Sequence, residues 1–348
     1  MKIFYSVEIL RFLASISILL FHYKHFFYPF STLSIVNYDS IEKSLPFYFF
    51  FKFFYVYGSY GVQLFYCISG FVFSHVYLLK KKNITFLNFF SNRFGRLYPL
   101  HLATLLLVVF LQFMNLNVLG SYQGLIQFND LFHFILQIFF ISAWGFEYGH
   151  SFNAPIWSVS IELGIYFIFF LLITNINKYK FFLILFLIIF LLLIKKSTHS
   201  NNLFIECAQL FFSGVFVYLL FLTPTSKLIL RIIALILLLF SFIGNFKIFL
   251  FCPSLLLLFL TIEPYIEKFS FKNLFKILGN LTYSLYLLHF PLQLFIVLVF
   301  NIFLISSSIF ISKYFFFIFF IVLFVISYLS YKFYEYPLNK LIRLKFSS

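Results

Sequence analysis

The stretch YSVEILRFLASISILLFHYKHFF, residues 5–27, decides the fold. It is an almost unbroken apolar run, and it reaches the length of about 20 residues that an α-helix needs to cross a bilayer. Glu8, Arg11 and His22 interrupt it and it lacks a small-residue cleavage site, so we expect a retained membrane helix rather than a signal peptide. Arg11 and His22 lie three helical turns apart on nearly the same face, separated by about 16 Å of rise.

The composition extends this interpretation to the whole chain. The 348 residues are 63% hydrophobic and 10% charged, whereas soluble domains average about 45–50% apolar and about 25% charged. No soluble domain of this length hides so much apolar surface, so the lipid bilayer is the expected partner. The net charge of +15 does not indicate a nucleic-acid partner, because the basic residues lie between apolar runs rather than along one face.

The three cysteines argue against two further kinds of site. Cys67, Cys207 and Cys252 are far apart in the sequence, and their spacing matches neither a metal site nor a disulfide framework. We therefore expect no metal and no permanently bound cofactor.

The remaining apolar runs predict an all-α, polytopic membrane helix bundle with about ten transmembrane helices. The predicted spans are residues 5–27, 57–79, 98–116, 155–174, 180–195, 204–222, 228–244, 248–262, 279–300 and 308–331. The runs at 180–195 and 248–262 are short for a full crossing.

Lysine and arginine residues in the short loops predict the orientation. With the N-terminus inside, most of the 25 basic residues fall in cytoplasmic loops, so both termini are predicted to be cytoplasmic. Residues 125–143 are apolar enough to cross, but a crossing there would invert every later loop. We therefore interpret 125–143 as an interfacial or re-entrant helix on the outer face, within a large extracytoplasmic loop at 117–154.

Ionisable side chains inside predicted spans mark candidate functional sites, because they are costly in lipid. Besides Arg11 and His22, these include Glu162, about one and a half turns inside the outer end of the fourth span, and His289, near the middle of the ninth. Simpler alternatives are a local ion pair between Glu8 and Arg11 and an interfacial position for His22.

Arg93 and Arg96 lie three residues apart at the cytoplasmic start of the third span and share a helix face. Arginine binds phosphate groups in a bidentate manner, which makes the pair a candidate phosphate site. The alternative is ordinary anchoring of the helix end by positive charge. Pro99 suits a first helical turn, which predicts that this helix begins near residue 98.

Five sequence segments occur in a fixed order. They are Arg11 with His22, Gly61-Val62-Gln63-Leu64-Phe65 through Ser69-Gly70-Phe71, Arg93-Phe94-Gly95-Arg96-Leu97-Tyr98-Pro99, Trp157-Ser158 with Glu162, and Tyr283-Ser284-Leu285-Tyr286-Leu287 with His289. With these segments in this order, the chain resembles the acyltransferase 3 family of membrane acyltransferases. The resemblance extends from Glu8 to the C-terminal segment Tyr334-Glu335-Tyr336-Pro337. Each segment is a weak pattern alone, but five in order on a suitable topology are a specific signal.

The resemblance implies ten spans with cytoplasmic ends. From the run of apolar segments we expect a single acyltransferase 3 membrane domain over residues 1–348, with no appended soluble domain. The resemblance also implies an O-acyltransferase of the inner membrane, most simply an O-acetyltransferase. Such an enzyme uses cytoplasmic acyl-CoA as donor and acylates a sugar hydroxyl of a surface polysaccharide, such as lipopolysaccharide O-antigen or exopolysaccharide. Its partners would be acyl-CoA, a saccharide acceptor and the bilayer, with any partner protein unidentified.

The chemistry of such an enzyme suggests roles for the residues, because a histidine can act as general base toward a sugar hydroxyl and arginines can bind the phosphates of CoA. His22 would be the catalytic base or would carry the acyl group transiently, and Glu162 would orient a histidine or bind the acceptor. The expected donor-binding residues are Arg11, Arg93 and Arg96. The expected substrate-binding or supporting residues are Ser69, Trp157, Tyr283 and His289.

Three other classes share some of these features. A polysaccharide flippase or transporter would be favoured by inverted repeats or paired broken helices, neither of which the sequence contains. A lipid-linked glycosyltransferase or polymerase usually has acidic motifs in its outer loops, where this chain has only isolated acids. A non-catalytic membrane scaffold is disfavoured by the clustered His, Arg and Glu residues.

Overall fold

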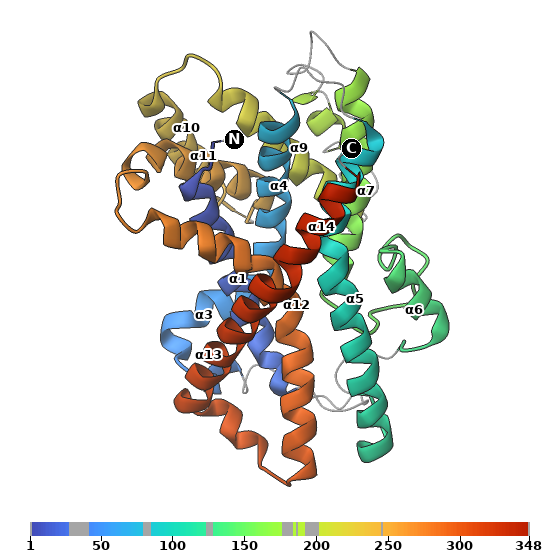
Figure 1. The fold of residues 1–348 in the computed structure, drawn as a ribbon. Coiled ribbons are helices and arrows are strands. Elements are labelled where there is room, and N and C mark those ends of the chain that lie inside the picture. Colours follow the sequence, from blue (N-terminus) through green and yellow to red (C-terminus); the bar gives the residue numbers. More distant parts are fainter. Residues whose placement is uncertain are drawn as a thin grey trace. The chain divides into compact units, whose positions relative to one another are not determined.

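The computed structural model describes residues 2–27, 42–78, 85–122, 128–175, 184–185, 187–191, 202–244 and 246–346. Within these ranges the chain is helical and contains no strand (Figure 1). The α-helices are α1 (Tyr5–Tyr23), α3 (Tyr48–Tyr57), α4 (Gly61–Tyr77), α5 (Phe86–Leu119), α6 (Leu131–Ile138), α7 (Ile156–Asn175), α9 (Leu203–Phe221), α10 (Lys227–Phe240), α11 (Ile248–Ile266), α12 (Lys272–Ile302), α13 (Lys313–Ser330) and α14 (Tyr336–Phe346). Short helices η1 (Lys24–Phe27), η2 (Gly58–Tyr60) and η3 (Ser307–Ile311) are 3₁₀, whereas η4 (Tyr331–Glu335) is a π-helix.

The multi-pass membrane architecture is confirmed. In the described part of the chain, 7 helical stretches are long and apolar enough to cross a membrane. They are Tyr5–Phe27, Tyr48–Tyr77, Phe86–Leu119, Leu203–Phe221, Ile248–Ile266, Lys272–Ile302 and Lys313–Lys345.

The count of ten spans stays a prediction, as does the cytoplasmic location of the termini. The predicted span at 180–195 lies mostly outside the described residues, and α10 has 14 residues. The run at 248–262 is longer than expected, because α11 extends it to 19 residues.

The chain forms two compact units, each assembled from separate segments. Unit 1 comprises Met1–Ala14, Tyr60–Thr85 and Ile161–Asn280, and unit 2 comprises Ser15–Ser59, Phe86–Ser160 and Leu281–Ser348.

Unit 1 is organised around the close packing of α4 and α9. A β-carbon at Gly70 would lie 2.7 Å from the carbonyl carbon of Phe211, and one at Gly214 would lie 2.8 Å from that of Cys67. The two glycines therefore let the helix backbones touch, as small residues do in membrane helix pairs. Gln63 of α4 also donates a hydrogen bond to Glu206 of α9 at 2.8 Å, so the two helices run in the same direction.

Unit 2 contains most of α12, from Leu281 onward, and the C-terminal part of α1, from Ser15 onward. Phe26, Phe310, Phe315 and Phe319 pack ring against ring where η1, η3 and α13 meet, and Tyr23 donates to the Phe310 carbonyl at 2.9 Å. This aromatic cluster fixes the end of α1 that carries His22.

Helix α5 corrects one prediction. It has 34 residues and begins at Phe86, so Pro99 lies deep inside the helix rather than in its first turn. At about 1.5 Å per residue such a helix is longer than the hydrocarbon core of a bilayer. The segment with Arg93 and Arg96, which suggested a helix start, is instead part of an extension of α5. Helix α14 packs along α5. Gly95 makes room there, since a β-carbon at residue 95 would lie 3.0 Å from Ile342.

The described part of 125–143 contains no helix long enough to cross a bilayer, whereas its place on the outer face stays a prediction. Helix α6 has only 8 residues, which is far too short to span a bilayer, and turns and irregular backbone follow it up to α7.

Candidate functional site

Two histidines that are far apart in the sequence meet in unit 2. The Nδ1 atom of His22 on α1 lies 2.7 Å from the Nε2 atom of His289 on α12. The rings are stacked, with centroids 4.9 Å apart and planes tilted by 29°, and the ring of His25 stacks on His22 at 4.7 Å. His289 is buried, whereas His22 is half-buried.

The backbone around this histidine pair is also held by polar contacts. His289 Nδ1 lies 2.6 Å from the Tyr286 carbonyl oxygen one turn earlier. Gln293, one turn later, donates to the His22 carbonyl at 3.0 Å. Both ends of the contact are therefore fixed by α12.

The same turns of α12 connect to several other elements of unit 2. The Tyr286 hydroxyl donates to the Pro155 carbonyl at 2.7 Å and lies 2.9 Å from the Ser158 hydroxyl in the first turn of α7. Asn153 donates to the Leu287 carbonyl at 3.4 Å. Trp157 is half-buried in this same first turn of α7.

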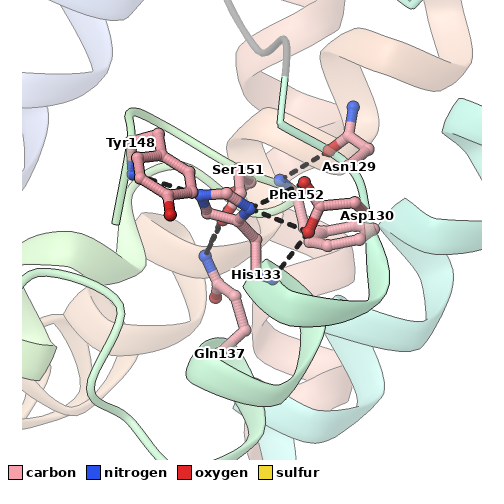
Figure 2. A network of polar contacts seen from close by, with 7 residues as sticks. All are labelled: Asn129, Asp130, His133, Gln137, Tyr148, Ser151 and Phe152. Atoms are coloured by element: carbon pink, nitrogen blue, oxygen red, sulfur yellow. Dashed lines mark hydrogen bonds and ion pairs between the residues drawn. The ribbon is translucent and has the colours of Figure 1, made fainter. Parts of the chain in front are cut away.

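The loop that leads into α7 is held rigid by its own polar network (Figure 2). Asp130 caps α6 by accepting the His133 backbone N–H at 2.9 Å, and it also accepts a hydrogen bond from the His133 ring. The backbone bond lowers the pKa of the Asp130 carboxyl below its ordinary value. His133 Nε2 accepts the Tyr148 N–H at 3.2 Å, and Gln137 donates to the Ser151 carbonyl at 3.0 Å. Both ring nitrogens of His133 are occupied by the fold, so this histidine is structural.

The predicted donor residues of unit 2 lie on α5. Arg93 and Arg96 are half-buried one turn apart. The Tyr283 hydroxyl donates to the carbonyl of Leu97, the residue after Arg96, at 2.6 Å, which joins this part of α5 to α12.

A buried carboxyl that was not among the predicted site residues lies nearby. Glu335 ends the π-helix η4 and is 7% exposed. It accepts hydrogen bonds from Ser284 and Ser330, and the neighbouring Tyr334 donates to the Pro99 carbonyl of α5 at 3.2 Å. The sequence signal that could have identified Glu335 is its position after a long apolar run, because an ionisable residue there needs hydrogen-bond partners.

Unit 1 contains the other predicted residues. Arg11 forms an ion pair with Glu8 at 2.9 Å, one turn earlier on α1, so the predicted local pair is present. Glu8 in turn packs against Gly279, where a β-carbon would lie 2.8 Å from the Glu8 β-carbon. Ser69 and Glu162 are half-buried on α4 and α7.

A comparison with protein-family models assigns the chain. The acyltransferase 3 model, described as an acyltransferase domain, matches residues 4–332. The chain belongs to the acyltransferase 3 family. No curated protein and no solved structure matches it.

Membership of the acyltransferase 3 family and the membrane-spanning helices together make the chain a membrane acyltransferase. The structure joins His22, His289, Tyr286 and Ser158 in one unit through short contacts. Tyr283 bonds the Leu97 carbonyl of α5, and Arg93 and Arg96 lie just before Leu97 in the same unit. The catalytic, donor-binding and acceptor-binding roles of the predicted residues stay predictions.

The described residues of the acyltransferase form no metal cluster, and a cavity in unit 2 is apolar. In the described ranges, no three His, Cys, Asp or Glu side chains are arranged to hold a metal ion. A cavity of about 180 Å³ between α5, α12 and α13 is lined only by apolar side chains, among them Leu288 and Leu292. It is smaller than typical ligand sites and has no chemical group to act on a substrate.

Proposed function

We propose that this acyltransferase moves an acyl group, most simply acetyl, from cytoplasmic acyl-CoA to a hydroxyl of a surface-polysaccharide sugar, such as one in lipopolysaccharide O-antigen or an exopolysaccharide. We place the enzyme in the inner membrane, because donor and acceptor would then approach from opposite sides of it. The family assignment over residues 4–332 supports acyl transfer. The single observation that carries the chemistry is the contact of the half-buried His22 with the buried His289.

The reaction needs a base, because a sugar hydroxyl is a weak nucleophile at neutral pH. His22 takes the hydroxyl proton as the oxygen attacks the thioester carbonyl carbon. A new carbon–oxygen bond forms, the carbon–sulfur bond breaks, and the proton passes from His22 to the departing CoA sulfur. The products are the acylated sugar and free CoA, with no net gain or loss of protons.

Donor recognition is assigned to the arginines. CoA carries a diphosphate and a 3′-phosphate, and guanidinium groups bind phosphate oxygens in pairs. Arg93 and Arg96 are one turn apart on α5, so both side chains can engage one phosphate cluster. Arg11 is proposed as a further donor residue, with Glu8 holding its side chain, and Glu162 as an acceptor-binding or orienting residue.

Mass spectrometry of surface glycans tests this proposal. Cells that produce the protein are compared with cells that lack it and with cells producing His22→Ala. We expect an acyl substituent on a surface sugar that is lost without the protein and lost with His22→Ala, while membrane levels of the variant stay normal. His75→Ala is the matched control, since the ring of His75 on α4 bonds the Lys2 backbone carbonyl and packs against Phe4 and Tyr218.

Two results would contradict the proposal. Unchanged acylation with His22→Ala would remove the base assignment. If whole polysaccharide chains were missing from the surface while the exported sugars carried normal acyl groups, a transport function would be favoured instead.

A further inference from the structure

We propose that His289 is a positioning residue that holds His22 in the tautomer with hydrogen on Nδ1 and the lone pair on Nε2. The inference rests on the proposed function for its catalytic meaning, because it names the Nε2 atom of His22 as the one that takes the hydroxyl proton. The tautomer itself can be measured without any acyl-transfer assay.

The Tyr286 carbonyl can only accept a hydrogen bond, because it carries no hydrogen. Its oxygen lies 2.6 Å from His289 Nδ1, so Nδ1 of His289 must carry the hydrogen and donate it. His289 is 1% exposed, and a positive charge is costly in such a site. A neutral ring with hydrogen on Nδ1 has its lone pair on Nε2.

The tautomer of His289 determines that of His22. Two ring nitrogens 2.7 Å apart share a hydrogen bond only if one of them carries the hydrogen. Since Nε2 of His289 has the lone pair, Nδ1 of His22 donates. The neutral His22 ring therefore has its lone pair on Nε2, which is the tautomer less favoured by free histidine in water.

The surrounding contacts keep this chain in place. Gln293 holds the His22 backbone through its carbonyl at 3.0 Å. The Tyr286 hydroxyl is bound to the Pro155 carbonyl at 2.7 Å, which fixes the turn of α12 whose carbonyl starts the chain. Position and tautomer of His22 are thus set by α12 before a substrate binds.

The arrangement has a consequence for catalysis. When Nε2 of His22 takes a proton, the ring becomes positively charged and its Nδ1–H still donates to His289. That bond is then charge-assisted and stronger. An aspartate does the same for the histidine of serine proteases, where it fixes tautomer and orientation, but here the supporting group is a neutral imidazole.

The tautomer is tested by ¹⁵N NMR of histidine-labelled protein in lipid nanodiscs. His22→Gln identifies the His22 ring signals by their loss. We expect a protonated Nδ1 and an unprotonated Nε2 for His22 in the parent protein. His289→Leu should shift His22 toward the Nε2–H form, whereas His289→Gln should restore the parent pattern, because its amide oxygen reaches about as far as the imidazole Nε2 and accepts a hydrogen bond.

Kinetics with the same variants give the second readout. A positioned general base contributes about 10²–10⁴-fold to the rate, so we expect His289→Leu to lower kcat by roughly 10- to 100-fold, with the KM for acyl-CoA unchanged. His289→Gln should recover most of kcat. His101→Gln is the control, since His101 is an equally buried histidine on α5 whose ring bonds a backbone carbonyl.

The outcomes separate the two proposals. An Nε2–H tautomer of His22 in the parent protein, or identical tautomer and kcat in parent and His289→Leu, would overturn the role of His289. If the tautomer pattern holds but the protein transfers no acyl group, the proposed function fails and the positioning contact stands. If transfer depends on His22 but Gln at residue 289 does not rescue it, the positioning role fails alone.

Discussion

Gly279 on α12 lies against Glu8 on α1 so closely that any β-carbon at residue 279 would overlap the Glu8 side chain, at 2.8 Å from its β-carbon. Glu8 holds Arg11 at 2.9 Å. The absence of a side chain at residue 279 therefore determines where the Glu8–Arg11 pair lies.

We predict that Gly279→Ala displaces this pair. The added methyl group meets a β-carbon that cannot rotate away, and such overpacking costs about 1–3 kcal/mol. Thermal unfolding of the purified protein should show the loss, and titration with acyl-CoA should show weaker donor binding if Arg11 contacts the donor. Glu8→Gln is the comparison, because it keeps the shape and removes the charge. Equal stability of Gly279→Ala and the parent would show that α1 and α12 adjust freely.

The paired glycines of α4 and α9 predict a larger effect. Gly70→Ala and Gly214→Ala each place a methyl group against a backbone carbonyl of the facing helix, and a backbone cannot move as a side chain does. We expect either change to separate the helices and to lower the unfolding temperature more than Gly279→Ala does. Val76→Ala on the same helix should cost less, since it only removes part of a half-buried side chain. An effect no larger than that of Val76→Ala would count against close backbone contact.

Hydropathy and charge predicted much of this architecture because both act locally along the chain. The apolar runs at 5–27 and 279–300 are helices, and the segment at 125–143 contains only a short helix. The predicted start of α5, near residue 98, was wrong by about three turns. A helix can continue past the bilayer surface, because charged residues are no longer costly there.

Contacts between residues far apart in the chain could not be predicted from the sequence. His22 and His289 were both selected as ionisable residues in spans, but nothing local indicates that residues separated by 267 positions touch. Glu335 was passed over because it follows the last predicted span, whereas the helix continues through η4 into α14. Glu263 was missed for another reason: its partners are backbone N–H groups of α1, which no side-chain pattern reveals.

That contact leads to a prediction about folding. Glu263 is 2% exposed and accepts the backbone N–H groups of Tyr5 at 2.8 Å and Ser6 at 2.7 Å, two donors that the first turn of a helix leaves unpaired. Glu263→Ala strands both in a buried site, and each stranded donor costs about 1–3 kcal/mol. We expect a clear drop in unfolding temperature.

Glu267→Ala is the matched control for Glu263→Ala. Glu267 lies one turn later and pairs with Lys2 at 2.9 Å, but the two side chains are 36% and 56% exposed. Exposed ion pairs contribute about 0–1 kcal/mol, so this variant should unfold close to the parent. If both variants lost similar stability, the cause would be removal of a carboxylate from this end of α11, and the capping of α1 would not explain the loss.

The last prediction concerns the donor site. Arg93→Ala and Arg96→Ala should each weaken acyl-CoA binding, because each removes a guanidinium proposed to contact phosphate. Single losses of charge-assisted hydrogen bonds are worth about 1.5–3 kcal/mol, which corresponds to a rise in Kd of roughly 10- to 150-fold. Arg343→Ala is the control, since Arg343 is exposed on α14, the helix that packs along α5.

Isothermal titration of acyl-CoA against the protein in nanodiscs measures these affinities, and a second series with dephospho-CoA separates the 3′-phosphate from the diphosphate. If Arg93 binds the 3′-phosphate, Arg93→Ala should weaken acyl-CoA binding and leave the dephospho form unaffected. Donor affinity that is unchanged in both variants would return these arginines to the role of anchoring a helix end at the membrane surface. That result would leave His22 and its partner His289 untouched, because their contact does not involve α5.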